Sequence, residues 1–123
     1  MKCLVTGGAG FIGSHLVEKL LQDGHQVTAL DNLAVGRLAN ISHLRHLDAF
    51  RFAEFDLAAL QPGHPAFDGV EEVFHLGAMA DIVPSIQQPL VYHRANVDGT
   101  AAVLECARAA GVKRFVYAAS SSC

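Results

Sequence analysis

The sequence predicts a doubly wound α/β domain, with helices on both faces of a parallel sheet. Short β-branched, apolar runs alternate along its 123 residues with stretches of helical periodicity. The runs are apolar on both faces, which is typical of buried parallel strands joined by right-handed crossovers. Ligands of such sheets bind beyond the carboxyl ends of the strands, and the candidate site residues named below follow these runs. We therefore expect one domain with its site at that edge.

Five strands are predicted, in the sheet order 3-2-1-4-5. Residues 2–6 form the first strand, and a helix follows that starts at Gly10 and ends at Gly24, with Ile12, Leu16 and Leu20 on one face. The other predicted strands are residues 26–30, 50–55, 71–76 and 114–119.

Three further segments connect these strands. Residues 37–47 are expected to form a polar-faced helix with an apolar stripe of Leu38, Ile41, Leu44 and Leu47. Residues 57–69 contain two prolines and are expected to form a turn of helix followed by a loop. Residues 90–110 form the longest predicted helix, which ends at Gly111. Its expected inward residues are Val97, Thr100, Ala101, Leu104 and Ala107.

Composition and charge argue against several classes of function. A net charge of −3 and the lack of a Lys or Arg run give no electrostatic footprint for nucleic acid or an anionic membrane. No apolar run approaches membrane-spanning length and the N-terminus carries no signal-like apolar region, so we expect a cytoplasmic protein. Cys3, Cys106 and Cys123 are odd in number and scattered, as expected for reduced thiols. His43 and His46 lie three apart, but no further ligand stands near them in the sequence, so we expect a solvated helix face and no metal site.

The stretch TGGAGFIGSH, residues 6–15, lies directly after the first apolar run. Gly8, Gly10 and Gly13 satisfy G-x-G-x-x-G, and Gly7, Gly10 and Gly13 satisfy the wider G-x-x-G-x-x-G spacing. A strand that enters a helix through such a turn brings unshielded N–H groups and the helix dipole to a pyrophosphate. The alternative is a tight turn with close helix packing and no ligand.

Asp31 closes the second strand, eighteen positions after Gly13. A carboxylate there can accept both ribose hydroxyls of an adenosine, whereas the alternative is a solvated aspartate at a strand end. Strand, turn, helix, strand and acid in this order predict dinucleotide binding. We expect NAD rather than NADP because Asp31 would repel a 2′-phosphate. Arg37 is close enough in sequence to help with such a phosphate, but an arginine facing solvent is the simpler interpretation.

Five motifs now carry a resemblance that covers the whole chain. They are TGGAGFIGSH, DNL at 31–33, HLGAMA at 75–80, NVDGT at 96–100 and YAASSSC at 117–123. In this order and spacing they resemble the extended short-chain dehydrogenase/reductases, and most of all the nucleotide-sugar epimerases of the UDP-glucose 4-epimerase type. The resemblance implies a Rossmann-type fold that binds NAD.

The resemblance also implies roles for individual residues. Phe11 and Ile12 would present N–H groups to the pyrophosphate, in the turn made by Gly7, Gly10 and Gly13. Asp31 and Asn32 would hold the adenosine ribose, with Gly36 in the loop that follows. The remaining cofactor contacts would come from Asp56, Leu57, Leu76, Gly77, Ala78 and Asn96.

Three of these assignments have a simpler alternative. Asp56 resembles the aspartate that accepts from the adenine amino group, but it can also simply cap the turn that follows. Asn96 resembles an asparagine that braces the active-site strands, but it can also be a solvated helix residue. Ser120 matches the serine or threonine that would hydrogen-bond the reacting sugar oxygen, although three consecutive serines can equally be a polar strand end.

The general base of the family, a Tyr-x-x-x-Lys pair, is missing from the sequence. Tyr92 is followed four positions later by Asn96, and Tyr117 by Ser121. After the position of Ser120, the related dehydratases carry an Asp-Glu pair and the related decarboxylases carry a Glu. This sequence has two further serines there. The difference favours epimerisation, since that reaction needs no additional acid.

We therefore expect residues 1–123 to be the incomplete NAD-binding domain of a nucleotide-sugar epimerase, inactive alone and without its C-terminal substrate lobe. The complete enzyme is expected to bind a nucleotide sugar and to dimerise through the 90–110 helix. The alternatives are a dehydratase, decarboxylase or reductase of the same family, a non-catalytic NAD-binding module, and one half of a split enzyme.

Overall fold

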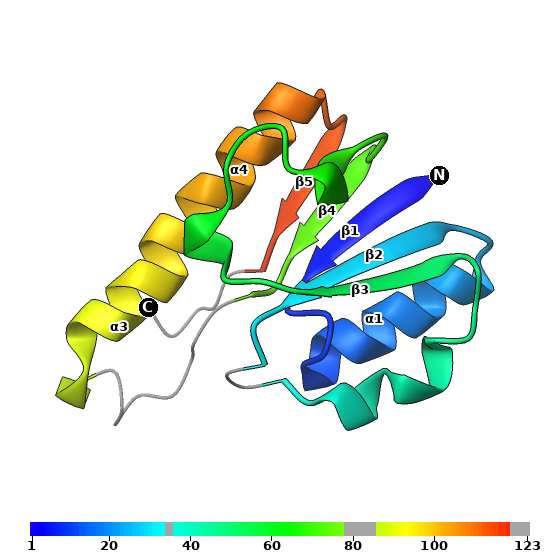
Figure 1. Cartoon of the computed structure of the whole chain (residues 1–123), viewed down its shortest axis with the longest axis horizontal. Helices are drawn as coiled ribbons and strands as arrows, with labels where there is room; N and C mark the ends of the chain where they lie inside the picture. Colours follow the sequence, from blue (N-terminus) through cyan, green and yellow to red (C-terminus); the bar gives the residue numbers. More distant parts are fainter. Residues whose placement is uncertain (34–35, 78–85, 119–123) are drawn as a thin grey trace.

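Five parallel strands form one sheet in the order β3-β2-β1-β4-β5, as the sequence predicts (Figure 1). The computed structural model describes residues 1–33, 36–77 and 86–118. The strands are β1 (Lys2–Thr6), β2 (Gln26–Asp31), β3 (Phe50–Glu54), β4 (Glu72–His75) and β5 (Arg114–Tyr117). In register, Thr6 pairs with Leu30 and His75, and His75 pairs with Tyr117. The carboxyl ends of the strands thus meet along one edge.

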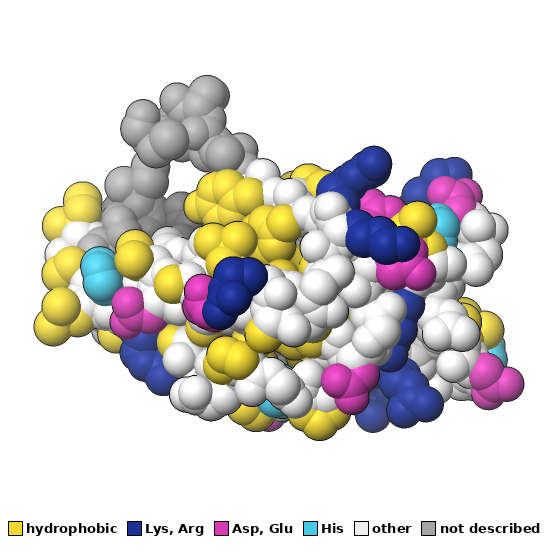
Figure 2. Space-filling view, turned by 90° about the horizontal axis from the view of Figure 1, so that it is seen from above, with side chains coloured by type: hydrophobic (Ala, Val, Ile, Leu, Met, Phe, Trp, Pro, Cys, Tyr) yellow, Lys and Arg dark blue, Asp and Glu magenta, His cyan; other side chains and the backbone are white. Residues whose placement is uncertain are grey.

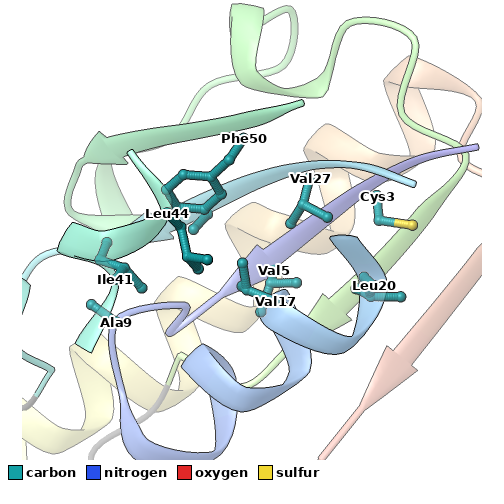
Figure 3. Packing of buried hydrophobic residues seen from close by; sticks show 10 residues of the cluster. Cys3, Val5, Ala9, Val17, Leu20, Val27, Ile41, Leu44 and Phe50 are labelled. Carbon is teal, nitrogen blue, oxygen red and sulfur yellow. The ribbon is translucent and has the colours of Figure 1, made fainter. Parts of the chain in front are cut away.

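Helix α1 (Phe11–Gln22) covers one face of the sheet, and Gly24 ends it with φ +89°, as expected. Its buried residues are Gly13, Ser14, Val17 and Leu20. The predicted face is therefore wrong at Ile12, which is exposed, because the contact of Gly13 with the preceding turn sets the rotation of the helix. Figure 3 shows the core beneath α1, formed by Cys3, Val5, Ala9, Val17, Leu20, Val27, Ile41, Leu44 and Phe50.

Residues 37–47 do not form the predicted helix. The structure has two short 3₁₀ turns there, η1 (Leu38–Asn40) and η2 (Ser42–Leu44). Ile41 and Leu44 of the predicted stripe are buried, whereas Leu38 and Leu47 are exposed. The backbone N–H of Arg37 and the side-chain amide of Asn40 both donate to Ala9 O, at 3.0 and 2.7 Å. These long-range bonds tie the segment to the glycine turn and compete with regular helix geometry.

The other face of the sheet is covered by the β3–β4 connection and by the long C-terminal helix. The predicted turn after β3 is confirmed as η3 (Leu57–Ala59), and a second turn, η4 (Pro65–Phe67), follows it. The core on this face is formed by Leu4, Leu30, Leu60, Phe67, Val70, Val73, Val103, Cys106 and Ala107. Cys3 and Cys106 are free and buried, one in each core.

The predicted helix 90–110 is present as α3 (Pro89–His93), a π-helical turn η5 (Arg94–Asp98) and α4 (Gly99–Ala110). Gly111 ends it with φ +73°, as predicted. The predicted inward face is wrong at Val97, Ala101 and Leu104, which are exposed, and right at Ala107 and at Thr100, whose hydroxyl bonds His75 of β4. Gly99, Val103 and Cys106 face the sheet instead. The extra residue in the π turn shifts the helical phase, because Gly99 N–H bonds back five positions to Arg94 O.

Charges of both signs lie interspersed on the face that Figure 2 shows, without a patch of one sign. On the side that carries α3 and α4, hydrophobic side chains gather at the surface. Among the helices of the described ranges, none has the length and apolar character needed to cross a bilayer.

Candidate functional site

The glycine turn lies between β1 and α1, at the carboxyl edge of the sheet. Gly7 has φ +70°, and its N–H donates to Leu30 O at 2.8 Å. A Cβ on Gly7 would lie 2.8 Å from the carbonyl carbon of Leu76, and a Cβ on Gly13 would overlap Gly7 O. Close packing therefore requires glycine at both positions, as the alternative interpretation of the motif proposed.

Close packing does not require glycine at position 10 as strictly as at positions 7 and 13. The φ of Gly10, −75°, is open to any residue, and a Cβ would be 3.2 Å from Gly7 O, a tight contact without overlap. Gly10 is the N-cap of α1, and no side chain of the described residues caps this helix end. Phe11 and Ile12 follow, with side chains that are 79% and 70% exposed. The first N–H groups of the helix, which have no intrahelical partner, thus form a positively polarised site suited to an anion.

Asp31 is buried, with an exposed fraction of 7%. Ala9 N–H donates to its Oδ2 at 3.1 Å, and Leu33 N–H donates to its Oδ1 at 2.8 Å. The structure therefore contradicts the alternative of a solvated strand end. Each carboxylate oxygen keeps a further acceptor site, so Asp31 is held beside the glycine turn with capacity for two more donors.

Gly36 lies against this carboxylate. A Cβ there would be 2.6 Å from Asp31 Oδ2 and 2.8 Å from the carbonyl carbon of Ala9. Asn32 is exposed next to Asp31, and the exposed Arg37 is fixed by its backbone bond to Ala9 O. The residues expected around an adenosine ribose are thus close together at one end of β2.

Asp56 caps the turn η3, as the simpler alternative proposed. Its Oδ1 accepts from Ala58 N–H at 3.1 Å, and its Oδ2 forms an ion pair with Arg94 of η5. The sequence reasoning missed Arg94, which lies 38 positions away. Both side chains are about half exposed, so one carboxylate oxygen remains within reach of solvent.

Leu57 fills the space between two glycines. A Cβ on Gly77 would lie 2.6 Å from Leu57 Cδ1, and a Cβ on Gly99 would lie 3.4 Å from Leu57 Cβ. The turn after β3, the turn after β4 and the start of α4 are therefore in contact, as expected for residues that share one site. Two candidate residues, Ala78 and Ser120, lie outside the described residues.

His75 ends β4 and is 2% exposed. Its Nδ1 is 2.6 Å from Thr6 Oγ1 and its Nε2 is 2.8 Å from Thr100 Oγ1. Burial lowers the pKa of His75 to about 4, so the ring is neutral at physiological pH. His75 is therefore a satisfied core histidine, bonded by one threonine that was expected to face inward, Thr100, and by one that gave no sequence signal, Thr6.

Asn96 lies in the π turn η5, half-buried. Its carbonyl accepts from Thr100 Oγ1 at 2.6 Å. Irregular helix geometry of this kind is common at functional sites. The role of the Asn96 side chain and the alternative of a solvated helix residue both stay predictions.

Within the described ranges, no group of three His, Cys, Asp or Glu side chains could hold a metal ion. His43 does contact one carboxylate, that of Glu18 on α1, which the sequence reasoning did not anticipate. The side chains of both residues are partly exposed, and the contact joins η2 to α1 at the surface.

A parallel sheet in this order, with a glycine turn after β1 and an acid at the end of β2, defines a Rossmann-type domain. The model of the NAD dependent epimerase/dehydratase family matches residues 3–123. The chain belongs to this family.

Individual relatives agree with that assignment. The chain is similar to the UDP-glucose 4-epimerase of Mycolicibacterium smegmatis, with 42% identity over 98% of this chain and 39% of that protein. It resembles the structure of a UDP-N-acetylglucosamine 4-epimerase from Methanobrevibacter ruminantium, with a TM-score of 0.89 and 31% identity over 98% of this chain and 38% of that one. A dTDP-glucose 4,6-dehydratase from Streptomyces venezuelae, solved with NAD bound, gives a TM-score of 0.85 and 36% identity over 94% and 38%. The chain thus spans less than half the length of each relative.

Proposed function

We propose that this chain is the NAD-binding part of a nucleotide-sugar epimerase. The observation that carries the proposal is the position of Asp31, whose buried carboxylate is bonded to Ala9 of the glycine turn beside the uncapped N-terminus of α1. An anion site and a diol acceptor at the carboxyl edge of one sheet are the two features that a dinucleotide requires.

The proposed cofactor residues divide into four groups. Gly7, Gly10, Phe11, Ile12 and Gly13 form the turn that binds the pyrophosphate. Asp31, Asn32 and Gly36 surround the adenosine ribose, while Asp56 and Leu57 face the adenine. Leu76, Gly77, Ala78 and Asn96 line the rest of the cofactor.

The cofactor is proposed to be NAD rather than NADP. A 2′-phosphate would have to approach the buried carboxylate of Asp31, and burial strengthens the repulsion between like charges. Arg37, which is close to Asp31 in the sequence, is exposed, and a solvated guanidinium compensates that repulsion only weakly.

The proposed reaction is inversion at C4 of a nucleotide sugar. A dinucleotide held by these residues would supply the transient acceptor for the hydride that leaves C4 of the sugar. Ser120 is proposed to hydrogen-bond the reacting sugar oxygen, and epimerisation is favoured because Ser121 and Ser122 provide no additional acid. The sequence contains no Tyr-x-x-x-Lys pair, so we propose that the 123 residues alone bind NAD without turnover.

Other functions make different predictions. A dehydratase of the same family is the nearest alternative, since one of the similar solved structures is that of a dTDP-glucose 4,6-dehydratase. A non-catalytic NAD-binding module would remain inactive in every combination, whereas one half of a split enzyme would become active on mixing with a complementary chain.

Calorimetric titration of the chain with NAD and with NADP tests the proposal. We expect saturable binding of NAD, weaker binding of NADP and no turnover of UDP-sugars by the chain alone. Failure to bind either dinucleotide would refute the proposed function. Turnover by the isolated chain would refute the proposal that catalysis needs a general base that these 123 residues do not contain.

We also propose that the complete enzyme dimerises through the helix α3–α4. Val97 and Leu104 are 53% and 46% exposed, and Leu90 at the start of the helix is 83% exposed. Exposed apolar side chains along one helix are a candidate surface for packing against a second copy.

A further inference from the structure

The hydrogen bonds around His75 can be assigned a direction. Thr6 Oγ1 accepts from Gly77 N–H at 2.9 Å, and it shares Leu76 N–H, at 3.0 Å, with the Thr6 carbonyl, at 3.1 Å. A hydroxyl carries one proton and Asn96 O can only accept, so the proton of Thr100 goes to Asn96 O. Thr100 Oγ1 must therefore accept from His75 Nε2–H, which leaves the proton of Thr6 to bond the other ring nitrogen across 2.6 Å. His75 Nδ1 is therefore the acceptor.

The whole chain of bonds follows this direction. A neutral imidazole that accepts at Nδ1 carries its proton on Nε2. Nε2–H then donates to Thr100 Oγ1 at 2.8 Å. The hydroxyl of Thr100 in turn donates to Asn96 O at 2.6 Å. Both ring nitrogens and both hydroxyls are satisfied, so the set can adopt one direction only.

The two ends of this chain of bonds lie at two parts of the candidate site. One end holds the N–H groups of Leu76 and Gly77, in the turn after β4 against which Gly7 packs. The other end holds the carbonyl of Asn96 in the π turn. A threonine that bonds the carbonyl four residues back in a helix competes with the regular backbone ladder, which accounts for an irregular turn at this place.

We infer that Thr6, His75 and Thr100 form a directed relay that sets the separation between the turn after β4 and the π turn, and that they are positioning residues for the dinucleotide site. This inference rests on the proposed function, because it concerns the same site. None of the three residues needs to touch the cofactor. Their effect is to hold Gly77 and Asn96 in place before binding, which lowers the cost of ordering the site.

Matched substitutions in the full chain test the relay. Thr100→Val keeps the shape of the side chain and removes the hydroxyl, whereas Thr100→Ser keeps the hydroxyl and removes a methyl group. We expect Thr100→Val to weaken NAD binding by about two- to tenfold, the size of one lost hydrogen bond. Thr100→Ser, which keeps the hydroxyl, should bind NAD like the wild type. Thr28→Val, a buried threonine of β2 outside the relay, is the control and should bind NAD like the wild type.

Nitrogen NMR of the imidazole provides a readout that packing alone would not change. We expect His75 to carry its proton on Nε2, in wild type and in Thr100→Ser. We also expect the Gly77 amide proton to exchange faster in Thr6→Val than in Thr6→Ser.

Each outcome decides between the claims. A proton on Nδ1 would refute the relay, and unchanged NAD binding by Thr100→Val would refute its positioning role. If the wild-type chain bound no dinucleotide, the proposed function and the positioning role would both fail, while the NMR result would still decide whether the relay exists.

Discussion

Ala9 N–H donates to Asp31 Oδ2 across 3.1 Å, and this bond joins the glycine turn to the end of β2. The carbonyl of the same Ala9 accepts from Arg37 N–H and from the Asn40 side chain. One residue without a polar side chain thus connects three segments through its backbone alone. The candidate ribose and pyrophosphate positions are therefore one structural unit, and a change in Asp31 affects both.

The first prediction concerns this carboxylate. Asp31→Ala should weaken NAD binding by about tenfold or more, since it removes hydrogen bonds to a charged acceptor. It should also reduce the preference for NAD over NADP, because the repulsion of a 2′-phosphate disappears. Titration of the variant with both dinucleotides measures this. The ratio of the two affinities comes from one sample, so partial unfolding cancels, and an unchanged ratio would contradict the assigned role.

The second prediction separates two glycines of the same turn. Gly13→Ala should destabilise the fold by about 1–3 kcal/mol, because its Cβ would overlap Gly7 O. Gly10→Ala should cost less, since the contact there is 3.2 Å, and should instead hinder the approach of an anion to α1. Thermal unfolding and NAD titration of both variants provide the comparison. If Gly10→Ala bound NAD as well as the wild type, the pyrophosphate would not lie over Gly10.

The third prediction concerns the ion pair between Asp56 and Arg94. Its side chains are about half exposed, so Arg94→Ala should change the free energy of unfolding by less than about 1 kcal/mol. If Asp56 binds adenine, removal of Arg94 frees Oδ2 for the adenine amino group, and NAD binding should be equal or tighter. Asp56→Asn keeps an oxygen for the cap of η3 and should weaken NAD binding without a large loss of stability. Weaker binding by Arg94→Ala would indicate that the arginine itself contacts the cofactor.

The strands and the placement of Asp31 could be predicted because each depends on local pattern, whereas the strand order followed from the Rossmann-type fold that the resemblance implies. Apolar runs, a glycine turn and the residue that ends a strand are all readable within about ten positions. The same holds for Gly24 and Gly111, which end helices at the predicted places with positive φ.

The features that were missed depend on partners far apart in the sequence. His75 bonds Thr6 and Thr100, which lie 69 and 25 positions away. The face of α4 was mispredicted because the π turn rotates the helix, and that turn forms where Thr100 meets Asn96 O and Gly99 meets Leu57. Residues 37–47 do not form the predicted helix because Arg37 and Asn40 bond Ala9 O instead. Periodicity carries no information about such contacts, because tertiary bonds override local preference.

The fourth prediction concerns self-association through α3–α4. Leu104→Glu should shift the chain toward monomer, because a charge would be buried in an apolar helix contact. Sedimentation velocity over a range of concentrations measures the change. Ala109→Glu is the matched control, since Ala109 is exposed on another side of the helix. Equal association of both variants and the wild type would place the interface elsewhere.

The fifth prediction concerns pH. Burial lowers the pKa of His75 from 6.5 to about 4, so between these values the unfolded chain binds a proton that the folded chain does not. The neutral ring therefore contributes its full stability above about pH 6.5, and up to about 3 kcal/mol is lost as the pH falls from 6.5 to 4.

The groups around the ring do not reverse this sign. The hydroxyls of Thr6 and Thr100 and the rings of Phe115 and Tyr117 face His75 from β1, α4 and β5, and all are uncharged in this range. Urea unfolding of the wild type and His75→Gln at pH 7.5 and pH 4.5 isolates the effect, since the six other histidines are common to both. The stability difference between the two proteins should shrink at the lower pH. A constant difference would mean that His75 is as easily protonated in the folded chain as in the unfolded one.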